Sequence, residues 1–299
     1  MKYNIIIADD LSDEAIDLLR QSGQNIYFGL EELPNADALI VRSTKVTKNL
    51  IDQAPQLKII ARAGVGMDTI DEIYAHSKNI FTANAPGGNA DNAAETTIGL
   101  MLGMAHNIVK AHSLLYHQKK WERNTTQGFE LKGKTLGIIG CGNVGSRVAK
   151  ISLALGMNIM IYDPYITQYP ENTIAVSELT DLLPKCDLLT LHVPLTIETY
   201  HMISEKELSL LPFQACIVNA SRGAVVNEAD LIQALNSRHI KSAALDVFET
   251  EPLSTDSPLF DIENIILLPH LGGASIEARN RVSIMAAEAV LDFLNNLSE

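Results

Sequence analysis

The sequence predicts an α/β protein with two parallel-sheet units, the second of which is inserted into the first. Short apolar runs alternate with helical patterns along the chain, and this alternation restarts near residue 135 after a long helical stretch. Strands that alternate with helices are typical of βαβ units, whose strands lie parallel in one sheet. An apolar stripe of helical period over 275–297 predicts a final helix that packs back on the first unit.

Three apolar runs open the first unit, and a helical pattern follows each of them. We expect strands at 4–8, 38–41 and 57–61 and helices at 12–22, 47–53 and 69–78. The chain is expected to cross into the second unit after the turn-rich segment 84–89, at a mostly helical stretch that spans 90–118.

The second unit contains six further strand candidates. They lie at 135–139, 158–162, 188–192, 216–220, 242–246 and 265–269. The predicted domains are therefore a discontinuous substrate-binding domain, 1–88 and 272–299, and a cofactor domain, 89–271.

Length, charge and cysteine content limit the class of protein. The 299 residues suffice for about two domains of ~100 to 200 residues. A formal charge of −13 argues against nucleic-acid or anionic-membrane partners, whose phosphates would repel the chain. Three cysteines without paired spacing predict neither a disulfide framework nor a metal site, and they favour a reducing compartment. The N-terminal apolar run is too short for a signal peptide, so we expect a cytoplasmic protein.

A glycine-rich turn is the most informative motif. Gly140, Gly142 and Gly145 lie between the strand at 135–139 and a helical stretch, and Asp163 follows the next apolar run. In a dinucleotide-binding turn the first Gly makes the bend, the second admits a pyrophosphate, and the third lets the helix pack closely. Asp163 would accept hydrogen bonds from the ribose hydroxyls and repel a 2′-phosphate, which favours NAD. The alternative is a glycine-rich turn without a ligand.

Three ionisable residues in the C-terminal third fit the oxidation of a 2-hydroxy acid. Arg222 and His270 each closely follow a predicted strand, and Glu251 lies between them in the sequence. Ligands of open α/β sheets bind beyond the carboxyl ends of strands. A histidine can take up and return a hydroxyl proton, a neighbouring carboxylate can orient it, and an arginine fork suits a substrate carboxylate.

With these motifs, the chain resembles the NAD-dependent D-2-hydroxyacid dehydrogenases over essentially its whole length. The resemblance implies two Rossmann-like domains and assigns Arg222 to the substrate carboxylate, His270 to acid/base catalysis and Glu251 to its support. It also implies that Asp246 holds the nicotinamide carboxamide. The remaining cofactor-binding residues that it implies are Gly140, Gly142, Asn143, Val144, Gly145, Asp163, Val193, Ala220, Ser221, Gly272 and Gly273.

Within this family the chain most resembles the short D-3-phosphoglycerate dehydrogenases, without a C-terminal regulatory domain. Arg42 and Lys45 follow one N-terminal strand and Arg62 follows another, so these cations can face a cleft at the strand ends and bind a phosphate. Gly64, Val65 and Gly66 would offer backbone N–H groups to a carboxylate. The alternative is that Arg42 and Arg62 form only surface or interdomain ion pairs.

This resemblance implies oxidation of D-3-phosphoglycerate to 3-phosphohydroxypyruvate, the first step of phosphorylated serine synthesis. A glyoxylate, hydroxypyruvate or other 2-hydroxyacid dehydrogenase would share the catalytic residues, and a non-catalytic NAD sensor that recruits a protein partner is a second alternative. The resemblance suggests a homodimer through 90–118. No metal is expected. Trp121 is expected to be structural, His192 a strand-end residue, and Cys141 a packing residue.

Overall fold

The computed structural model describes residues 2–297 and forms two compact units. The first unit comprises Met1–Ala90 and Gly273–Glu299, and the second comprises Asp91–Gly272. Each unit has a parallel sheet covered by helices, so the predicted α/β class with one unit inserted into the other is confirmed.

The first unit has a five-stranded parallel sheet in the order β2-β1-β3-β4-β5. This is the flavodoxin-like order, in which the strand order reverses between β1 and β3. Its strands are β1 (Asn4–Ile7), β2 (Asn25–Phe28), β3 (Ala38–Val41), β4 (Ile59–Arg62) and β5 (Phe81–Ala83). Its helices are α1 (Asp13–Gln21), α2 (Lys48–Asp52), α3 (Glu72–Ser77) and α10 (Ile276–Asn296).

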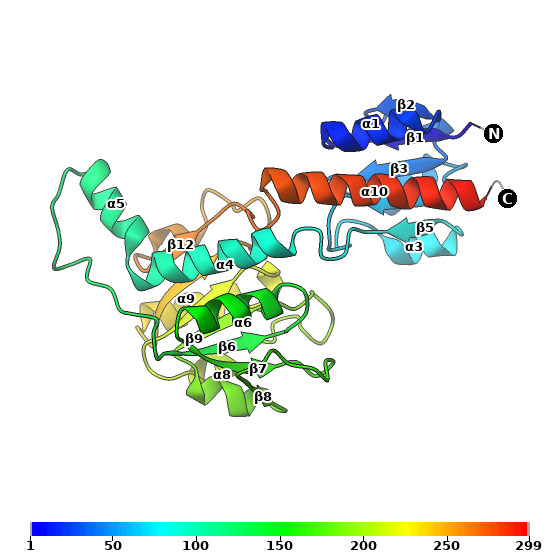
Figure 1. The fold of residues 1–299 in the computed structure, drawn as a ribbon. Coiled ribbons are helices and arrows are strands. Elements are labelled where there is room, and N and C mark those ends of the chain that lie inside the picture. Colours follow the sequence, from blue (N-terminus) through cyan, green and yellow to red (C-terminus); the bar gives the residue numbers. More distant parts are fainter. Residues whose placement is uncertain (1, 298–299) are drawn as a thin grey trace. The chain divides into compact units, whose positions relative to one another are not determined.

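The C-terminal helix α10 completes the first unit, as the apolar stripe predicted (Figure 1). Ser275 caps the helix by accepting a hydrogen bond from the N–H of Ala278 at 3.1 Å. Val282, Ala286 and Val290 recur every four residues, which places them on one face, and they are buried against α1, β3 and β4. Because α10 supplies this part of the core, the first unit cannot be built from the N-terminal segment alone.

The second unit has a seven-stranded parallel sheet in the order β12-β11-β10-β9-β6-β7-β8. Counted from β6, this order corresponds to the Rossmann arrangement with one added strand, and it reverses between β6 and β9. Its strands are β6 (Thr135–Ile139), β7 (Asn158–Tyr162), β8 (Thr173–Val176), β9 (Leu188–Leu191), β10 (Ala215–Asn219), β11 (Ile240–Leu245) and β12 (Ile265–Leu267).

Helices cover both faces of this second sheet (Figure 1). The helices α4 and α6 contribute to one buried cluster, and α7, α8 and α9 contribute to the cluster on the other face. The helices are α4 (Ala90–Ala105), α5 (Ile108–Tyr116), α6 (Gly145–Ala154), α7 (Leu179–Leu182), α8 (Glu205–Leu210) and α9 (Glu228–Asn236).

The predicted helical stretch 90–118 is observed, and it divides into α4 and α5 at Asn107, which has a left-handed backbone with φ 50°. Three strands were not predicted, β2, β5 and β8, and all of them contain exposed positions and are short. Among the described residues, no helix has both the length and the apolar character needed to cross a membrane.

Candidate active site

The glycine turn of the second unit connects β6 to α6 at the point where the strand order reverses. Gly140 has φ 84°, a conformation that favours glycine, and a Cβ there would lie 2.6 Å from the carbonyl oxygen of His192. A Cβ on Gly145 would overlap the carbonyl oxygen of Gly140. A Cβ on Gly142, in contrast, would meet nothing within 4 Å. The turn is therefore tight at its two ends and open in the middle.

This geometry fits a dinucleotide. The open backbone at Gly142 leaves room for a pyrophosphate at the N-terminus of α6, where unpaired N–H groups favour an anion. Asp163 follows β7 and is nearly buried. Its carboxylate accepts hydrogen bonds from the N–H groups of Cys141 at 2.8 Å and Tyr165 at 2.9 Å. Each oxygen keeps a second acceptor site, so ribose hydroxyls can still be bound.

The loop after β10 presents Arg222. Asn219, the last residue of β10, accepts hydrogen bonds through Oδ1 from the N–H and the hydroxyl of Ser221, at 3.1 and 2.8 Å. Its amide nitrogen donates to the carbonyl oxygen of Arg222 at 2.9 Å. Arg222 Nη1 donates to the carbonyl oxygen of Ser221 at 2.7 Å. A buried strand-end amide thus fixes the turn that carries the candidate carboxylate-binding arginine.

A close backbone contact joins this loop to the segment that carries Glu251. A Cβ on Gly223 would overlap the carbonyl group of Phe248. Only glycine allows the two loops to approach this closely. Arg222 and Glu251 are near enough that the guanidinium contributes to lowering the pKa of the carboxyl group.

His270 and Glu251 form a hydrogen-bonded pair. His270 Nδ1 lies 2.7 Å from Glu251 Oε2, and the N–H of Phe248 donates to Glu251 Oε1 at 3.1 Å. Partial burial raises the pKa of Glu251, but the hydrogen bond and charge of His270, the Phe248 N–H and Arg222 together lower it below its usual value. Because Nδ1 faces Glu251, Nε2 is the ring nitrogen available for proton exchange.

Asp246 supports the loop that carries His270. The Asp246 side chain is fully buried, and its oxygens accept hydrogen bonds from the N–H groups of Leu271 at 2.6 Å and Gly272 at 2.8 Å. Burial raises its pKa despite these bonds. His270 itself has a left-handed backbone with φ 56°, uncommon outside glycine. Asp246 therefore holds the two residues that follow the unusual backbone conformation of His270. The contact of Asp246 with the nicotinamide carboxamide stays a prediction.

Two further residues near the turn have strongly shifted pKa values. Burial lowers the pKa of His192 to about 3, so it stays neutral, and its Nε2 lies 3.1 Å from the hydroxyl of Thr190. Burial, together with the charge of Asp163, raises the pKa of the Cys141 thiol to about 11. A thiol with such a pKa is a poor nucleophile, which agrees with the expected packing role.

The candidate substrate residues lie together at the carboxyl ends of β3 and β4 in the first unit. Arg62 Nε donates to the carbonyl oxygen of Arg42 at 3.2 Å, and its Nη1 donates to the carbonyl oxygen of Gly66. The amide nitrogen of Asn84 donates to the carbonyl oxygen of Val65 at 2.6 Å, and the N–H of Ala85 donates to that of Gly64 at 2.8 Å. The carbonyl groups of the loop 64–66 are thus held from both sides.

Asp9 has a role in this unit that the sequence analysis missed. It follows β1, and its Oδ2 accepts the N–H groups of Arg42, Ser43 and Thr44 at 2.6, 3.0 and 3.0 Å. Burial raises its pKa, but these bonds outweigh that effect and lower it overall. The available signal was its position at the end of the first predicted strand, next to the reversal of strand order.

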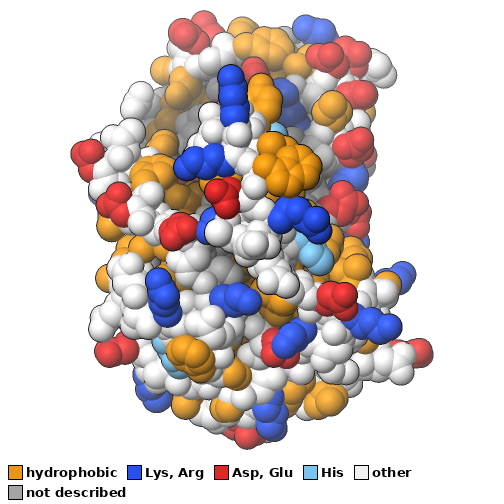
Figure 2. Space-filling view, turned by 90° about the vertical axis from the view of Figure 1, so that its left-hand side faces the viewer, with side chains coloured by type: hydrophobic (Ala, Val, Ile, Leu, Met, Phe, Trp, Pro, Cys, Tyr) orange, Lys and Arg blue, Asp and Glu red, His pale blue; other side chains and the backbone are white. Residues whose placement is uncertain are grey.

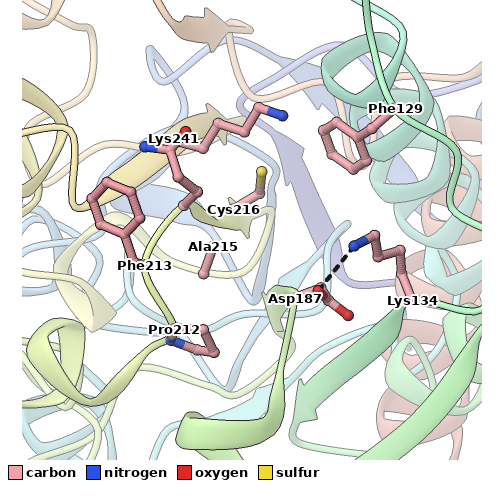
Figure 3. A pocket seen from close by; sticks show the side chains of 9 residues that line it. Phe129, Lys134, Asp187, Pro212, Phe213, Ala215, Cys216 and Lys241 are labelled. Carbon is pink, nitrogen blue, oxygen red and sulfur yellow. Dashed lines mark hydrogen bonds and ion pairs between the residues drawn. The ribbon is translucent and has the colours of Figure 1, made fainter.

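A cavity of about 210 Å³ lies elsewhere in the second unit (Figure 3). Lys134, Asp187 and Phe213 precede β6, β9 and β10, and Lys241 lies near the start of β11, so the cavity is at the amino ends of the strands. Lys134 Nζ pairs with Asp187 Oδ1 at 3.2 Å. Because Arg222 and His270 follow carboxyl ends, the cavity is on the opposite edge of the sheet and is not the candidate active site.

Comparison with known proteins identifies the family. Residues 98–272 match the family model described as D-isomer specific 2-hydroxyacid dehydrogenase, NAD binding domain. The chain is 41% identical over 297 residues to a D-3-phosphoglycerate dehydrogenase of Methanocaldococcus jannaschii, which covers 96% of this chain and 56% of that protein. It spans about half the length, 54–58%, of the first D-3-phosphoglycerate dehydrogenases that it matches.

Two other relatives are similar over nearly their full length. A hydroxypyruvate reductase of Thermotoga maritima is 39% identical over 302 residues, which cover 97% of both chains. The crystal structure of NAD⁺-bound 3-phosphoglycerate dehydrogenase of Entamoeba histolytica has a TM-score of 0.84 at 30% identity and covers 99% of this chain and 96% of that one. These matches confirm the resemblance and the cofactor NAD predicted from the sequence: the chain belongs to the D-isomer-specific 2-hydroxyacid dehydrogenases.

Proposed function

We propose that the chain oxidises D-3-phosphoglycerate to 3-phosphohydroxypyruvate with NAD, as the first step of phosphorylated serine synthesis. The observation that carries the proposed chemistry is the 2.7 Å contact between His270 and Glu251, beyond the carboxyl ends of a Rossmann-type sheet. The second unit acts as the NAD-binding domain in this proposal, and the first unit acts as the substrate-binding domain.

In the proposed reaction, bound NAD supplies the hydride acceptor. His270 Nε2 takes the proton of the substrate's C2 hydroxyl and later releases it to solvent. Glu251 stabilises the imidazolium and fixes the ring, since its oxygen already contacts Nδ1. Arg222 binds the substrate carboxylate through its planar fork of donors. We expect His270→Ala to lower kcat by at least about 10²-fold, the usual contribution of a general acid or base.

The phosphate of the substrate is assigned to cations of the first unit. The guanidinium of Arg62 contacts the carbonyl groups of Arg42 and Gly66, which places it beside the loop 64–66 in a chain whose net charge is −13. The name D-3-phosphoglycerate dehydrogenase on relatives of 39–41% identity supports this substrate.

Hydroxypyruvate reduction is a second candidate, which the match to the Thermotoga maritima enzyme over 97% of both chains favours. It would use the same His270, Glu251 and Arg222 without a phosphate. A non-catalytic NAD sensor is disfavoured because the His270–Glu251 pair is assembled.

The deciding experiment measures NADH formation by the purified protein with D-3-phosphoglycerate, D-glycerate, D-lactate and 2-hydroxyglutarate. NADH consumption with hydroxypyruvate and glyoxylate is measured in parallel. Preference for the phosphorylated acid would support the proposal, and preference for hydroxypyruvate would favour the second candidate. Absence of turnover with every acid would contradict both.

Arg62→Ala tests the phosphate assignment. We expect kcat/KM for D-3-phosphoglycerate to fall about 10- to 100-fold, because a charged hydrogen bond contributes roughly 1.5–3 kcal/mol. The kcat/KM for an unphosphorylated acid should change much less. Because Arg62 also donates to backbone carbonyl groups, its replacement could disturb the loop, and Arg42→Ala is therefore a second variant. Arg20→Ala is the matched control, since Arg20 is an exposed arginine of α1 that pairs with Asp17. Equal losses for both substrates would contradict a phosphate role.

We also propose that the chain forms a homodimer through 90–118. The support is an apolar surface on α5, which has no buried residue and exposes Ile108, Val109, Leu115 and Tyr116. Trp121, which we expected to be structural, is 79% exposed and is therefore not part of a buried core. Figure 2 views the molecule from the side on which α5 lies in Figure 1, and hydrophobic side chains are visible there among charges of both signs. The cytoplasmic location stays a prediction.

A further inference from the structure

We propose that Glu249 is a positioning residue for the catalytic pair, held in place by His201 and by the first turn of α9. This inference rests on the proposed acid/base role of His270 and Glu251. It concerns a second His–Glu contact in the same unit, for which the sequence analysis suggested no function.

The carboxylate of Glu249 is bound from two directions. Its Oε1 accepts a hydrogen bond from the N–H of Glu228 at 2.9 Å and lies 2.9 Å from His201 Nε2. The N–H of Glu249 in turn donates to Glu228 Oε1 at 2.6 Å. Glu228 is the first residue of α9, so the negative charge of Glu249 lies at a helix N-terminus, which stabilises it.

His201 is itself fixed as a donor. Its backbone N–H donates to the carbonyl oxygen of Ala224 at 2.8 Å, and its ring stacks on Tyr200 with centroids 4.0 Å apart. Asn227 Oδ1 accepts the N–H of Asp230, so the Asn227 amide nitrogen is the atom that lies 3.4 Å from His201 Nδ1. Nδ1 therefore serves as the acceptor and Nε2 carries the hydrogen, and a neutral imidazole is enough to donate to Glu249.

Glu249 lies two residues before Glu251 in a segment that is held at several points. The carbonyl group of Phe248 lies against Gly223, and the N–H of Phe248 donates to Glu251 Oε1. The Glu249 contacts hold the same segment at a further point. They thereby limit the positions from which Glu251 can reach His270 at 2.7 Å. A displacement of about 1 Å in such a group can reduce a rate roughly 10²-fold.

The cluster is maintained although the negative charges of Glu228 and Glu249 interact unfavourably. Burial, and then the charge of Glu249, raise the pKa of Glu228, and the hydrogen bond from the Glu249 N–H only partly offsets this. The side chains of His201 and Glu249 are only 25% and 33% exposed. Glu228 and Glu249 thus have like charges close together in a partly buried cluster. A positioning role for Glu249 explains this arrangement better than a role as a solvent-exposed charge that keeps the protein soluble.

The test compares Glu249→Ala, His201→Phe and Glu249→Gln with wild type. Because Gln keeps an oxygen that accepts both donors, Glu249→Gln should retain most of kcat. Glu249→Ala and His201→Phe should each lower kcat at least about tenfold, with NADH affinity by fluorescence unchanged within about twofold. The low-pH limb of kcat/KM for oxidation should move to lower pH, since a displaced Glu251 stabilises the imidazolium less. The double variant should be no worse than either single variant.

Glu263→Ala is the matched control, because Glu263 is also a paired carboxylate of the second unit, with Lys110 at 2.7 Å, and is highly exposed. It should behave as wild type. Thermal unfolding identifies variants that fail to fold. A folded Glu249→Ala with wild-type kcat and pH profile, or an equal loss in Glu249→Gln, would overturn the proposal.

A second readout does not depend on turnover. The Nδ1 resonance of His270 is followed by NMR in wild type and in Glu249→Ala at one fixed pH. The resonance should move in the variant, because a displaced Glu251 forms a weaker hydrogen bond with Nδ1, and an unchanged resonance would overturn the positioning role. If wild type oxidised no 2-hydroxy acid, the proposed function would fail, and this spectrum would still decide whether Glu249 positions Glu251 against His270.

Discussion

At Glu251, the interaction of the ionised carboxylate with His270 and its other partners can be tested through the pH dependence of stability. Its pKa is lowered from the usual 4.5, so its ionised form contributes stability that is fully present above that value. This contribution is lost as the pH falls through the lowered pKa. We expect Glu251→Gln to lower the thermal unfolding midpoint at about pH 6, and the difference from wild type should shrink below about pH 4. A difference that grows with falling pH would contradict the assigned interaction.

The same substitution has a separate effect on catalysis. A neutral amide at position 251 still contacts His270 Nδ1 but no longer stabilises a positive imidazole. We therefore expect kcat for oxidation to fall about tenfold and the low-pH limb of kcat/KM to move to lower pH. Steady-state kinetics across the pH range measure both effects. A variant with the wild-type profile would show that Glu251 does not support His270.

At the scale of the element, different glycines of the turn between β6 and α6 are needed for folding and for cofactor binding. A Cβ at Gly142 meets nothing, whereas a Cβ at Gly145 overlaps the carbonyl oxygen of Gly140. We expect Gly142→Ala to keep the wild-type unfolding midpoint and to weaken NADH binding about tenfold, because the methyl group would occupy the space for the pyrophosphate. Gly145→Ala should lower the unfolding midpoint. Fluorescence titration and thermal unfolding of both variants provide the measurements, and the reverse pattern would contradict this assignment.

At the scale of the whole molecule, the exposed apolar residues of α5 bear on the state of assembly. Val109 and Leu115 are each about half exposed on a helix that buries none of its residues. Contiguous exposed apolar surface usually marks an interface. We expect wild type to be a dimer by size-exclusion chromatography with light scattering, and Val109→Glu with Leu115→Glu to give a folded monomer. Ile73→Glu, which alters an exposed apolar residue of the first unit, is the control. A monomeric wild type would overturn the dimer.

The fold class and the candidate functional residues could be predicted from the amino-acid sequence. Strands such as β6 and β7 are almost entirely apolar, because parallel strands are buried on both faces, and the predicted bounds of these two strands were correct. Strands β2, β5 and β8 were missed because their partly exposed positions give no continuous apolar run. Glycine spacing and strand-end position indicated Gly140, Gly142 and Gly145 together with Asp163, Arg222 and His270 as candidate site residues.

Which functional groups come into contact depends on the tertiary structure. The contact between His201 and Glu249 joins residues 48 apart in the sequence, and that between Asp246 and Gly272 joins residues 26 apart. Neither pair has a spacing that predicts contact, since helices relate residues three or four apart and strands relate residues two apart. These groups meet because parallel strands bring loops from distant parts of the chain to one edge of a sheet, and that proximity is a property of the strand order and not of local sequence.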